Sequence, residues 1–526
     1  MTIKRSASAL KQVSRASQRA VGMGQKGGRN RKQKSEAIVR MYRQGLGDCF
    51  LITLPRKPEP FHILLDCGAL KSRHYGDQEM KDVVNDIIRA TTRVKTSRGR
   101  KVTQARLDVV AVTHEHWDHI SGFIQARELF DKVKIENVWT AWTEEPNNEV
   151  AQHLKNQFKK KKQAVEKALA LMSEKQENNG MIGLYQKAIS SVFGFFGEFG
   201  AASVGEAATS LRTTGAAWDY ILGRGKTTYC NPQNAPLEIE GLEGIRIYIL
   251  GPPKDPNFIR RKLSTKETYD QGRRQALTLY DSFLAAVTDD DTVFGDESML
   301  DLRERAFPFG ANFRISPETA SQMPFFQAKY GFEDGEEEWR RIDSDWLMLA
   351  GELALHLDNY TNNTCLAFAI ELGESGKVLL FPGDAQVGNW LSWGDLAWEI
   401  KTHNGESRTV KIDDLLARTV LYKVGHHGSH NATLRAKGLE KMESPELVAM
   451  IPVHRETAKD QAWEFPHLPL WERLKQKACG RVLLADSEGI DEIAEDVKRR
   501  LSPIEWKKFE NAVKFTPLYI EYRIAF

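Results

Sequence analysis

Apolar runs at the start of the chain predict a sheet that begins with antiparallel strands. Three runs cover residues 38–42, 49–54 and 61–65. A Gly-Leu-Gly turn separates the first two runs, and Pro55 ends the second. Short runs of this kind, bounded by glycine and proline, are typical of paired strands. The first antiparallel strands are therefore expected before residue 66.

Later runs predict strands that are buried on both faces. Residues 107–113 are almost continuously apolar, which is typical of an inner strand of a parallel sheet. Helical patterns lie on either side of this run, at residues 79–92 and 120–129. Further strands are predicted at residues 134–140, 245–250, 365–372, 377–381, 420–424, 448–453, 481–484 and 518–525. Strands and helices in this order predict an α/β sandwich.

Two segments without this strand pattern, at residues 149–234 and 254–359, predict large, mainly helical insertions. Residues 149–176 are charged and helical, with four consecutive lysines at 159–162. Residues 180–222 are rich in Gly, Ala and Phe, which fits a packed helical hairpin or a surface that faces lipid or a partner. The resulting division is a basic disordered arm (1–36), a first half of the sandwich (37–148), an insertion (149–234), a core strand (235–253), a second insertion (254–359) and a second half (360–526).

The net charge of +3 is unevenly distributed along the 526 residues. Residues 1–35 contain ten of the 74 Lys and Arg residues and no Asp or Glu. The remainder, which contains all 71 acidic residues, is mildly acidic. A polybasic arm attracts a polyanion such as nucleic acid or an anionic membrane surface. A solvated tail without a ligand and a transit peptide are the alternatives.

Cysteine usage and hydropathy favour a cytoplasmic protein. The five cysteines are odd in number, widely spaced and without a CxxC pair, which is typical of reduced thiols. No early apolar stretch is typical of a signal peptide, and no apolar run approaches the ~20 residues of a transmembrane helix. We therefore expect no transmembrane segment.

Two clusters account for six of the 13 histidines, and each cluster follows a predicted strand. The first comprises His114, His116 and His119, and the second comprises His426, His427 and His430. Imidazoles two residues apart on an extended loop can bind one metal ion, and Asp118 with His119 can bind a second. Imidazole and carboxylate are ligands that suit Zn²⁺. The first cluster therefore predicts a two-metal site.

The run from His114 to His119 resembles the signature of the metallo-β-lactamase fold. Further family motifs match in the same order along the chain: Asp66 after an early strand, Asp384 after a later one and His426 after the next. The resemblance implies a four-layer αββα sandwich with its metal site at the edge of two sheets. It implies two divalent ions, by default Zn²⁺, with Mn²⁺ or Fe as alternatives. The implied ligands are His114, His116, Asp118, His119, Asp384 as the bridge, and His426.

Shorter motifs narrow the resemblance to the hydrolase domain of DNA-uptake competence proteins, which is attached to a membrane channel in that branch. No channel accompanies it here. These motifs are Gly47-Asp48-Cys49, Asn362-Asn363-Thr364, Gly383-Asp384, His426-His427-Gly428-Ser429 and the segment 466–474. The resemblance covers roughly residues 38–145, 237–253 and 360–490, and it omits the arm and both insertions.

One family motif is missing. The third motif is usually a histidine between His119 and Asp384, where only His153 and His356 occur, and neither follows a predicted strand. The first metal would then be held by two histidines and Asp384, with water completing its shell. Competence-type relatives often lack this histidine too, so its absence does not imply a loss of activity.

The ligand set implies a mechanism in which a water that bridges two metals becomes the nucleophile. Asp66 would orient His116 or His119, or hold the nucleophile, and His427 is the favoured proton donor. With Asp118 these two residues form the predicted catalytic set. Spacing leaves open whether His426 or His427 binds metal, and His426 is predicted because strand alternation allows only one. Substrate contacts are predicted for Ser429, His430, Asn363 and His467.

Three functions are compatible with these features. The leading one is a phosphodiesterase or nuclease, because two metals suit in-line displacement at phosphorus and the arm attracts polyanions. The second is a hydrolase of an amide, lactone, thioester or peptide, with the insertions binding a regulatory protein partner, as in an effector of a bacterial defence system. The third is a metal-stabilised binding module without catalysis. The fold alone does not choose among them.

Overall fold

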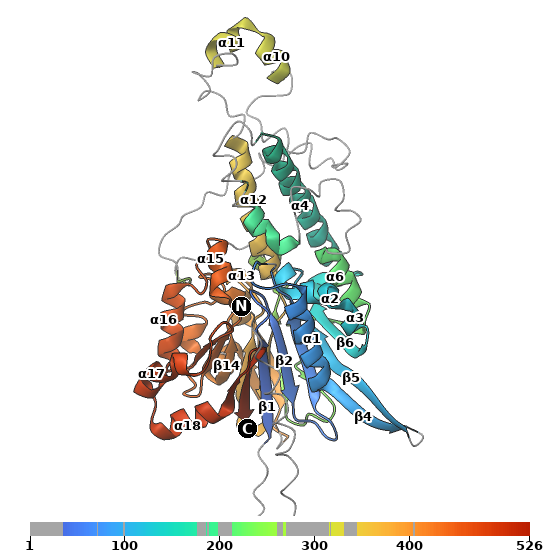
Figure 1. Cartoon of the computed structure of the whole chain (residues 1–526), viewed down its shortest axis with the longest axis vertical. Helices are drawn as coiled ribbons and strands as arrows, with labels where there is room; N and C mark the ends of the chain where they lie inside the picture. Colours follow the sequence, from blue (N-terminus) through green and yellow to red (C-terminus); the bar gives the residue numbers. More distant parts are fainter. Residues whose placement is uncertain are drawn as a thin grey trace, which may run out of the picture. The chain divides into compact units, whose positions relative to one another are not determined.

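The computed structural model is a mixed α/β protein with two large sheets and one hairpin (Figure 1). The predicted α/β class is thus confirmed. The structure describes residues 35–70, 72–97, 100–175, 186, 189–197, 213–259, 267–269, 315, 317–330, 345–402 and 405–526. The predicted basic arm lies, up to residue 34, outside the described residues.

The first sheet has nine strands. Its beginning, β1-β2-β3, is antiparallel, as the turn residues predicted. From β3 onward its neighbours β5, β6 and β7 run parallel, while β4 pairs antiparallel with β5 alone. The strands are, in spatial order, β17 (Val513–Phe515), β18 (Tyr519–Ala525), β1 (Glu36–Tyr42), β2 (Cys49–Leu54), β3 (Phe61–Cys67), β5 (Arg100–Ala111), β6 (Val133–Ala141) and β7 (Lys226–Cys230), with β4 (Thr92–Ser97) beside β5.

The second sheet has seven strands. Four of them, β11, β14, β15 and β16, run parallel to one another. In spatial order its members are β16 (Val482–Leu484), β15 (Val448–Ile451), β14 (Thr419–Lys423), β11 (Lys377–Phe381), β10 (Ala367–Leu372), β9 (Arg246–Gly251) and β8 (Leu237–Glu238). A separate hairpin pairs β12 (Ala397–Lys401) with β13 (Ser407–Lys411).

The helices of ordinary α type vary widely in length. The longest are α4 (Glu149–Lys175), α12 (Asp345–Asn363) and α1 (Asp77–Thr91). The shorter ones are α2 (Trp117–Gln125), α3 (Arg127–Phe130), α6 (Thr214–Leu222), α7 (Pro256–Ile259), α10 (Pro317–Gln322), α11 (Pro324–Tyr330), α13 (Val387–Ser392), α14 (Ile412–Ala417), α15 (Arg455–Asp460), α16 (Leu468–Lys477), α17 (Asp491–Arg500) and α18 (Pro503–Ala512). None of the described helices is both long and apolar enough to cross a membrane.

One hydrophobic core joins the two sheets. It contains Ile52 and Ile63 from the first sheet and Ile247, Phe368 and Leu379 from the second, all at most 4% exposed. These strands are apolar on both faces, so each sheet also needs a cover on its other side. Helices α1 and α2 contribute to the core on the far face of the first sheet, and α13, α14 and α16 to that of the second.

The two predicted insertions pack against each other through α4 and α12, which lie side by side in Figure 1. Their shared core contains Val165 of α4, Leu357 of α12, and Phe193 and Phe196 from the Phe-rich segment. Of the alternatives for that segment, the described part is packed core. The first insertion is not helical throughout, because the segment predicted at 149–234 also contains β7, which extends the first sheet beyond β6. None of the five cysteines forms a disulfide in the structure.

Candidate metal centre

Two parallel strands of the first sheet position one part of the centre. β3 and β5 pair in parallel, with Leu65 opposite Ala111. The chain leaves both strands at the same edge of the sheet, which brings Asp66 close to the residues that precede His114. Thr113 fixes this edge: its backbone N–H donates to Asp66 Oδ1 at 2.8 Å, and its hydroxyl donates to Asp66 Oδ2 at 2.7 Å.

Helix α2 begins directly at the histidine run. His116 is its N-cap residue, and Asp118 and His119 belong to its first turn. A negative charge such as that of Asp118 interacts favourably with the helix dipole there. Gly68 packs against this turn so closely that a Cβ there would lie 2.4 Å from the Asp118 carbonyl carbon. The backbone N–H of Asp48 donates to the Asp118 carbonyl at 2.9 Å. The backbone of the turn that carries Asp118 and His119 is therefore held from two sides.

Two parallel strands of the second sheet position the other part. Asp384 follows β11, and His426 and His427 follow the neighbouring parallel strand β14. The backbone N–H of His426 donates to Asp384 Oδ1 at 2.8 Å. The two sheets are joined here, because the N–H of Leu366 donates to the Thr113 carbonyl at 2.9 Å.

Backbone strain is concentrated at this edge. Five non-glycine residues of the described chain have positive φ, and three of them are Asp66 (52°), His426 (47°) and His427 (52°). Non-glycine residues in the left-handed region cost about 1–3 kcal/mol each and cluster at functional sites. The strain points to this edge as the functional part of the protein.

The side chains of three histidines and four aspartates converge at these strand ends. Three overlapping groups of His and Asp have ligand atoms that all lie within 4.8 Å of one another. These groups are His114 with His119 and Asp384, Asp48 with Asp66 and His119, and Asp118 with Asp384 and His427. The closest contacts are His119 Nε2 to Asp384 Oδ2 (3.0 Å), His427 Nε2 to Asp118 Oδ2 (2.9 Å) and His114 Nε2 to His116 Nδ1 (2.9 Å).

Three of these histidines have an oxygen acceptor on the opposite ring nitrogen. His119 Nδ1 lies 2.8 Å from Asp66 Oδ2, and His427 Nδ1 lies 2.7 Å from the Pro452 carbonyl. His114 Nδ1 lies 2.9 Å from the Thr113 hydroxyl oxygen, which donates its own proton to Asp66. Since such an acceptor holds the proton on Nδ1, it leaves Nε2 free for a metal.

A buried lysine pairs with the carboxylate of Asp384. Lys423 is fully buried and donates to Asp384 Oδ1 at 3.0 Å and to the Gly383 carbonyl at 2.8 Å. It also forms an ion pair with Asp48. Although burial alone would raise it, Lys423 and His119 hold the pKa of Asp384 well below its usual value. Asp384 is thus ionised and ready to bind a cation.

The charge balance of the centre fits metal ions. Five carboxylates there are at most 8% exposed, and among the described residues they face one equally buried lysine, Lys423. These acids are Asp48, Asp66, Asp118, Asp358 and Asp384. Burial raises the pKa of Asp48, and burial with the neighbouring Asp384 raises the pKa of Asp358 to about 7. Buried carboxylates require a compensating cation, and a His and Asp donor set suits Zn²⁺.

The structure brings His427, rather than His426, to the carboxylates. His427 Nε2 contacts Asp118, whereas both ring nitrogens of His426 are buried without a hydrogen-bond partner. Burial lowers the pKa of His426 to about 4. Strand alternation did not decide between them, because the chain leaves β14 through two successive left-handed residues. The geometry favours His427 over the predicted ligand.

A cavity of about 600 Å³ lies beside the centre, and His426 lines it. Three of the four residues predicted to contact substrate, Ser429, His430 and His467, also line this cavity. The fourth, Asn363, is buried at the end of α12, where its Oδ1 accepts from the backbone N–H of Asn389 at 3.0 Å. Asn363 thus has an internal hydrogen-bonding role.

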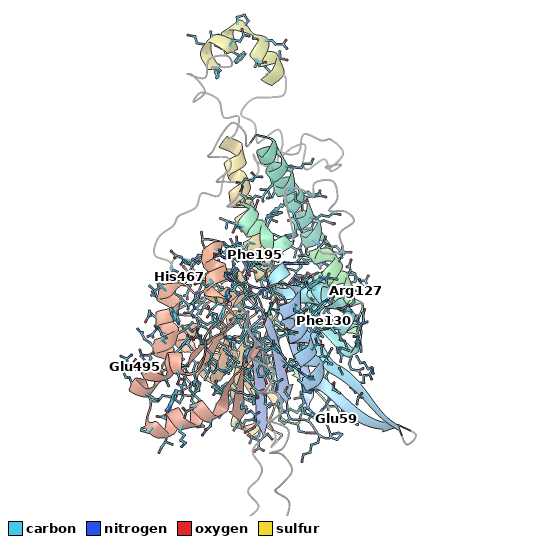
Figure 2. All side chains as sticks on the ribbon, in the orientation of Figure 1. Glu59, Arg127, Phe130, Phe195, His467 and Glu495 are labelled. Atoms are coloured by element: carbon cyan, nitrogen blue, oxygen red, sulfur yellow. The ribbon has the colours of Figure 1, made fainter. Side chains whose placement is uncertain are left out.

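Aromatic side chains form one wall of this cavity. Phe195 stacks on Trp463 with ring centroids 5.0 Å apart and also contacts the ring of His426 at 5.9 Å. Phe195 lies at the base of the α4–α12 pair, and His467 lies near α15 and α16 (Figure 2). The segment predicted as the first insertion therefore contributes directly to the surroundings of the centre.

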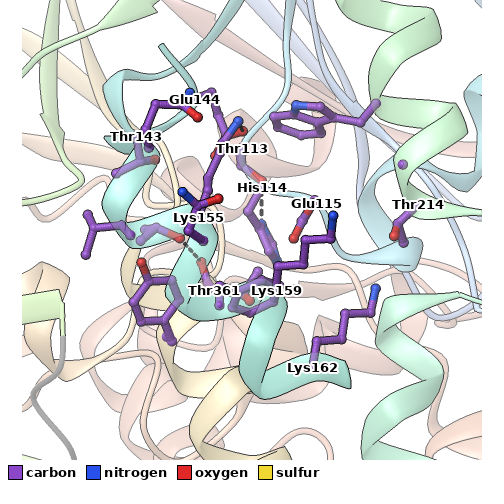
Figure 3. Close-up of a pocket in the computed structure, with 18 residues that line it drawn as sticks. Thr113, His114, Glu115, Thr143, Glu144, Lys155, Lys159, Lys162, Thr214 and Thr361 are labelled. Atoms are coloured by element: carbon purple, nitrogen blue, oxygen red, sulfur yellow. Dashed lines mark hydrogen bonds and ion pairs between the residues drawn. The ribbon is translucent and has the colours of Figure 1, made fainter. Parts of the chain in front are cut away.

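A second cavity, of about 390 Å³, is lined by His114 and by three lysines of α4 (Figure 3). These lysines, Lys155, Lys159 and Lys162, are spaced so that they share one face of the helix. Lys155 pairs with Glu144 at 2.7 Å. The buried hydroxyl of Thr143 and the indole N–H of Trp218, which also line the cavity, have no hydrogen-bond partner in the described structure. A run of lysines usually forms a solvated helix face, but Lys159 and Lys162 of the four-lysine run line a cavity.

Four residues of the centre were absent from the predicted site residues. One of them, Asp48, was named only within a motif that carried the resemblance. Thr113 and Lys423 adjoin predicted motifs, so their proximity to strand ends was a usable signal. Asp358 lies on α12, and no sequence pattern placed that helix against His116. No known family model matches this chain, and no curated protein matches it in sequence.

Proposed function

We propose that this protein is a metal-dependent hydrolase with a four-layer arrangement like that of the metallo-β-lactamase fold. The observation on which this rests is the convergence of buried His and Asp side chains from four strand ends, three of the histidines with an oxygen acceptor behind the ring. Such outer acceptors are characteristic of metal-binding histidines. A structural polar core would not require this arrangement.

The proposed ligands divide between two metal ions. His114 and His116 would hold one ion, and Asp118, His119 and His427 the other, with Asp384 between them. When bound, divalent ions lower the pKa of a coordinated water and so supply the nucleophile. Asp66 keeps His119 in the required tautomer, and Lys423 keeps Asp384 ionised and oriented. His426 faces the larger cavity, where it would contact substrate rather than metal.

We propose a phosphodiester substrate because of the lysine-lined cavity. Lys155, Lys159 and Lys162 bring cationic groups beside the strand end that bears His114. Lysine ammonium groups are a common means of binding the phosphates of a nucleic-acid strand. The substrate class is thus a phosphodiester, and the nuclease activity predicted from the sequence remains the leading form.

The test uses purified full-length protein with Zn²⁺ or Mn²⁺. We expect hydrolysis of bis-p-nitrophenyl phosphate, and of at least one among single-stranded DNA, double-stranded DNA, RNA and cyclic nucleotides. The control is the His116→Ala, Asp384→Ala double variant. Lys159→Ala with Lys162→Ala should raise KM for a nucleic-acid substrate about tenfold, equivalent to about 1.4 kcal/mol. Activity of the wild type no greater than that of the double variant on every phosphodiester would refute the proposal.

A second candidate is hydrolysis of an ester, amide or thioester with an apolar group. The aromatic wall of the larger cavity, Phe195, Trp463 and Phe465, favours it. Here the lysine substitutions should leave KM unchanged, while Trp463→Ala should raise it. The two candidate functions are distinguished by which cavity's substitutions raise KM.

A further inference from the structure

The histidines of the centre share one hydrogen-bonding arrangement, and His116 lacks one part of it. His114, His119 and His427 each have one ring nitrogen in the centre and the other on an oxygen acceptor within 2.9 Å. His116 also directs one nitrogen inward, with Nδ1 2.9 Å from His114 Nε2. Its outer nitrogen, Nε2, is buried and has no hydrogen-bond partner.

A carboxylate of α12 lies close to this outer nitrogen. Asp358 Oδ1 lies 3.9 Å from His116 Nε2, and it too is buried without a hydrogen-bond partner. The other carboxylate oxygen, Oδ2, accepts from the side-chain amide of Gln386 at 3.4 Å. A buried imidazole nitrogen and a buried carboxylate oxygen, both unsatisfied and facing each other, are complementary donor and acceptor.

The position of Asp358 is fixed by the packing of the insertions. Its helix neighbours Leu353 and Leu357 are buried against α4 and against Phe196. Phe196 in turn packs edge-on against the ring of His116, with centroids 4.8 Å apart. The insertions thus hold both the imidazole and its facing carboxylate.

We propose that Asp358 is the positioning residue of His116, so that α12 supplies the outer acceptor for one histidine of the first metal site. The inference rests on the proposed metal centre. Asp358 would accept the Nε2 proton of His116 in a hydrogen bond, which directs Nδ1 to the metal and increases its basicity. Asp66 has the equivalent place behind His119.

The test measures metal affinity directly. Metal-free full-length protein is titrated with Zn²⁺ against a competing chelator, and Co²⁺ spectra report the coordination of each site. Asp358→Asn should weaken one of two sites by about 10- to 100-fold, the usual effect of losing an outer acceptor. Asp358→Glu should recover part of the loss. Leu355→Ala, at an exposed position of the same helix, is the matched control and should bind like the wild type.

A second readout separates this role from a merely structural one. In EDTA, Asp358→Asn should unfold at the same temperature as the wild type or a higher one, because it removes an unpaired buried charge. With Zn²⁺ present the order should reverse. A structural role predicts lower stability in both conditions.

The outcomes also separate the inference from the proposed function. If the wild type binds two metals and Asp358→Asn binds both equally tightly, the inference is wrong and the hydrolase proposal stands. If the wild type binds less than one metal per chain, both are wrong.

Discussion

The ion pair between Lys423 and the two acids beside it provides a quantitative test of how the centre is held together. All three side chains are at most 1% exposed, so water cannot solvate a charge that loses its partner. The variant Lys423→Met keeps the length of the side chain. It removes the ammonium group that pairs with both Asp48 and Asp384, and with it the hydrogen bond to the Gly383 carbonyl.

The expected loss of stability is large. Removing one partner of a buried ion pair costs about 3–5 kcal/mol, and the lost hydrogen bond to a carbonyl adds about 1 kcal/mol. The total, about 4–6 kcal/mol, is a large part of the 5–15 kcal/mol that stabilises a typical domain. Added Zn²⁺ should recover part of the loss, since it neutralises Asp384.

Urea unfolding at pH 8 in EDTA measures this loss. Lys441→Met is the matched control, because Lys441 pairs with Asp413 at the surface, and it should change stability by less than about 1 kcal/mol. Adding Asp48→Asn to Lys423→Met should restore about 1–3 kcal/mol, as expected for coupled neighbours. The reasoning is refuted if Lys423→Met is no less stable than Lys441→Met, or if the two substitutions are additive.

Two further predictions concern positions outside the ion pair. Burial lowers the pKa of His62 to about 4 from its usual 6.5, so the unfolded chain binds the proton first as the pH falls. The free energy of unfolding should therefore fall by about 3 kcal/mol between pH 6.5 and 4, at about 1.4 kcal/mol per pKa unit. Urea titrations at each pH measure this decrease, and His62→Gln should abolish it. Gly68→Ala should destabilise the protein by about 1–3 kcal/mol and weaken Zn²⁺ binding, because the new Cβ would lie 2.4 Å from the Asp118 carbonyl carbon and 2.5 Å from the His119 nitrogen. Gly394→Ala, where no atom lies within 4 Å of the new Cβ, is its control in calorimetry and chelator competition, and equal effects of the two changes would contradict the packing argument.

The sequence predicted those parts of the fold that depend on local patterns. Continuous apolar runs identified the inner strands, for example β5 and β11, because such strands are apolar on both faces. β7 was missed, since its sequence KTTYC is short and largely polar, and only pairing with β6 makes it a strand. The hairpin β12–β13 was missed for the same reason. Four of its ten residues are apolar, and only their alternation with polar residues would indicate a strand.

The candidate site shows a similar division. The histidine run and Asp384 were predictable, because each follows an apolar strand in a short motif. The choice between His426 and His427 was not, since it depends on two left-handed residues in succession, which strand alternation does not anticipate. Asp358 was not predictable either, because its position depends on how α12 packs on α4, a helix far earlier in the sequence.

The pairing of β1 with β18 has a consequence for the order of folding. Glu36 lies opposite Ala525 and Tyr42 opposite Tyr519, so the strand that flanks β1 is supplied almost 500 residues later. During synthesis β1 would remain an open sheet edge, with unpaired N–H and C=O groups available to another chain. Contacts of such high sequence separation also slow folding. Loss of the β18 segment should therefore cause edge-to-edge association of the nascent or truncated protein, even though the candidate metal centre lies at other strand ends.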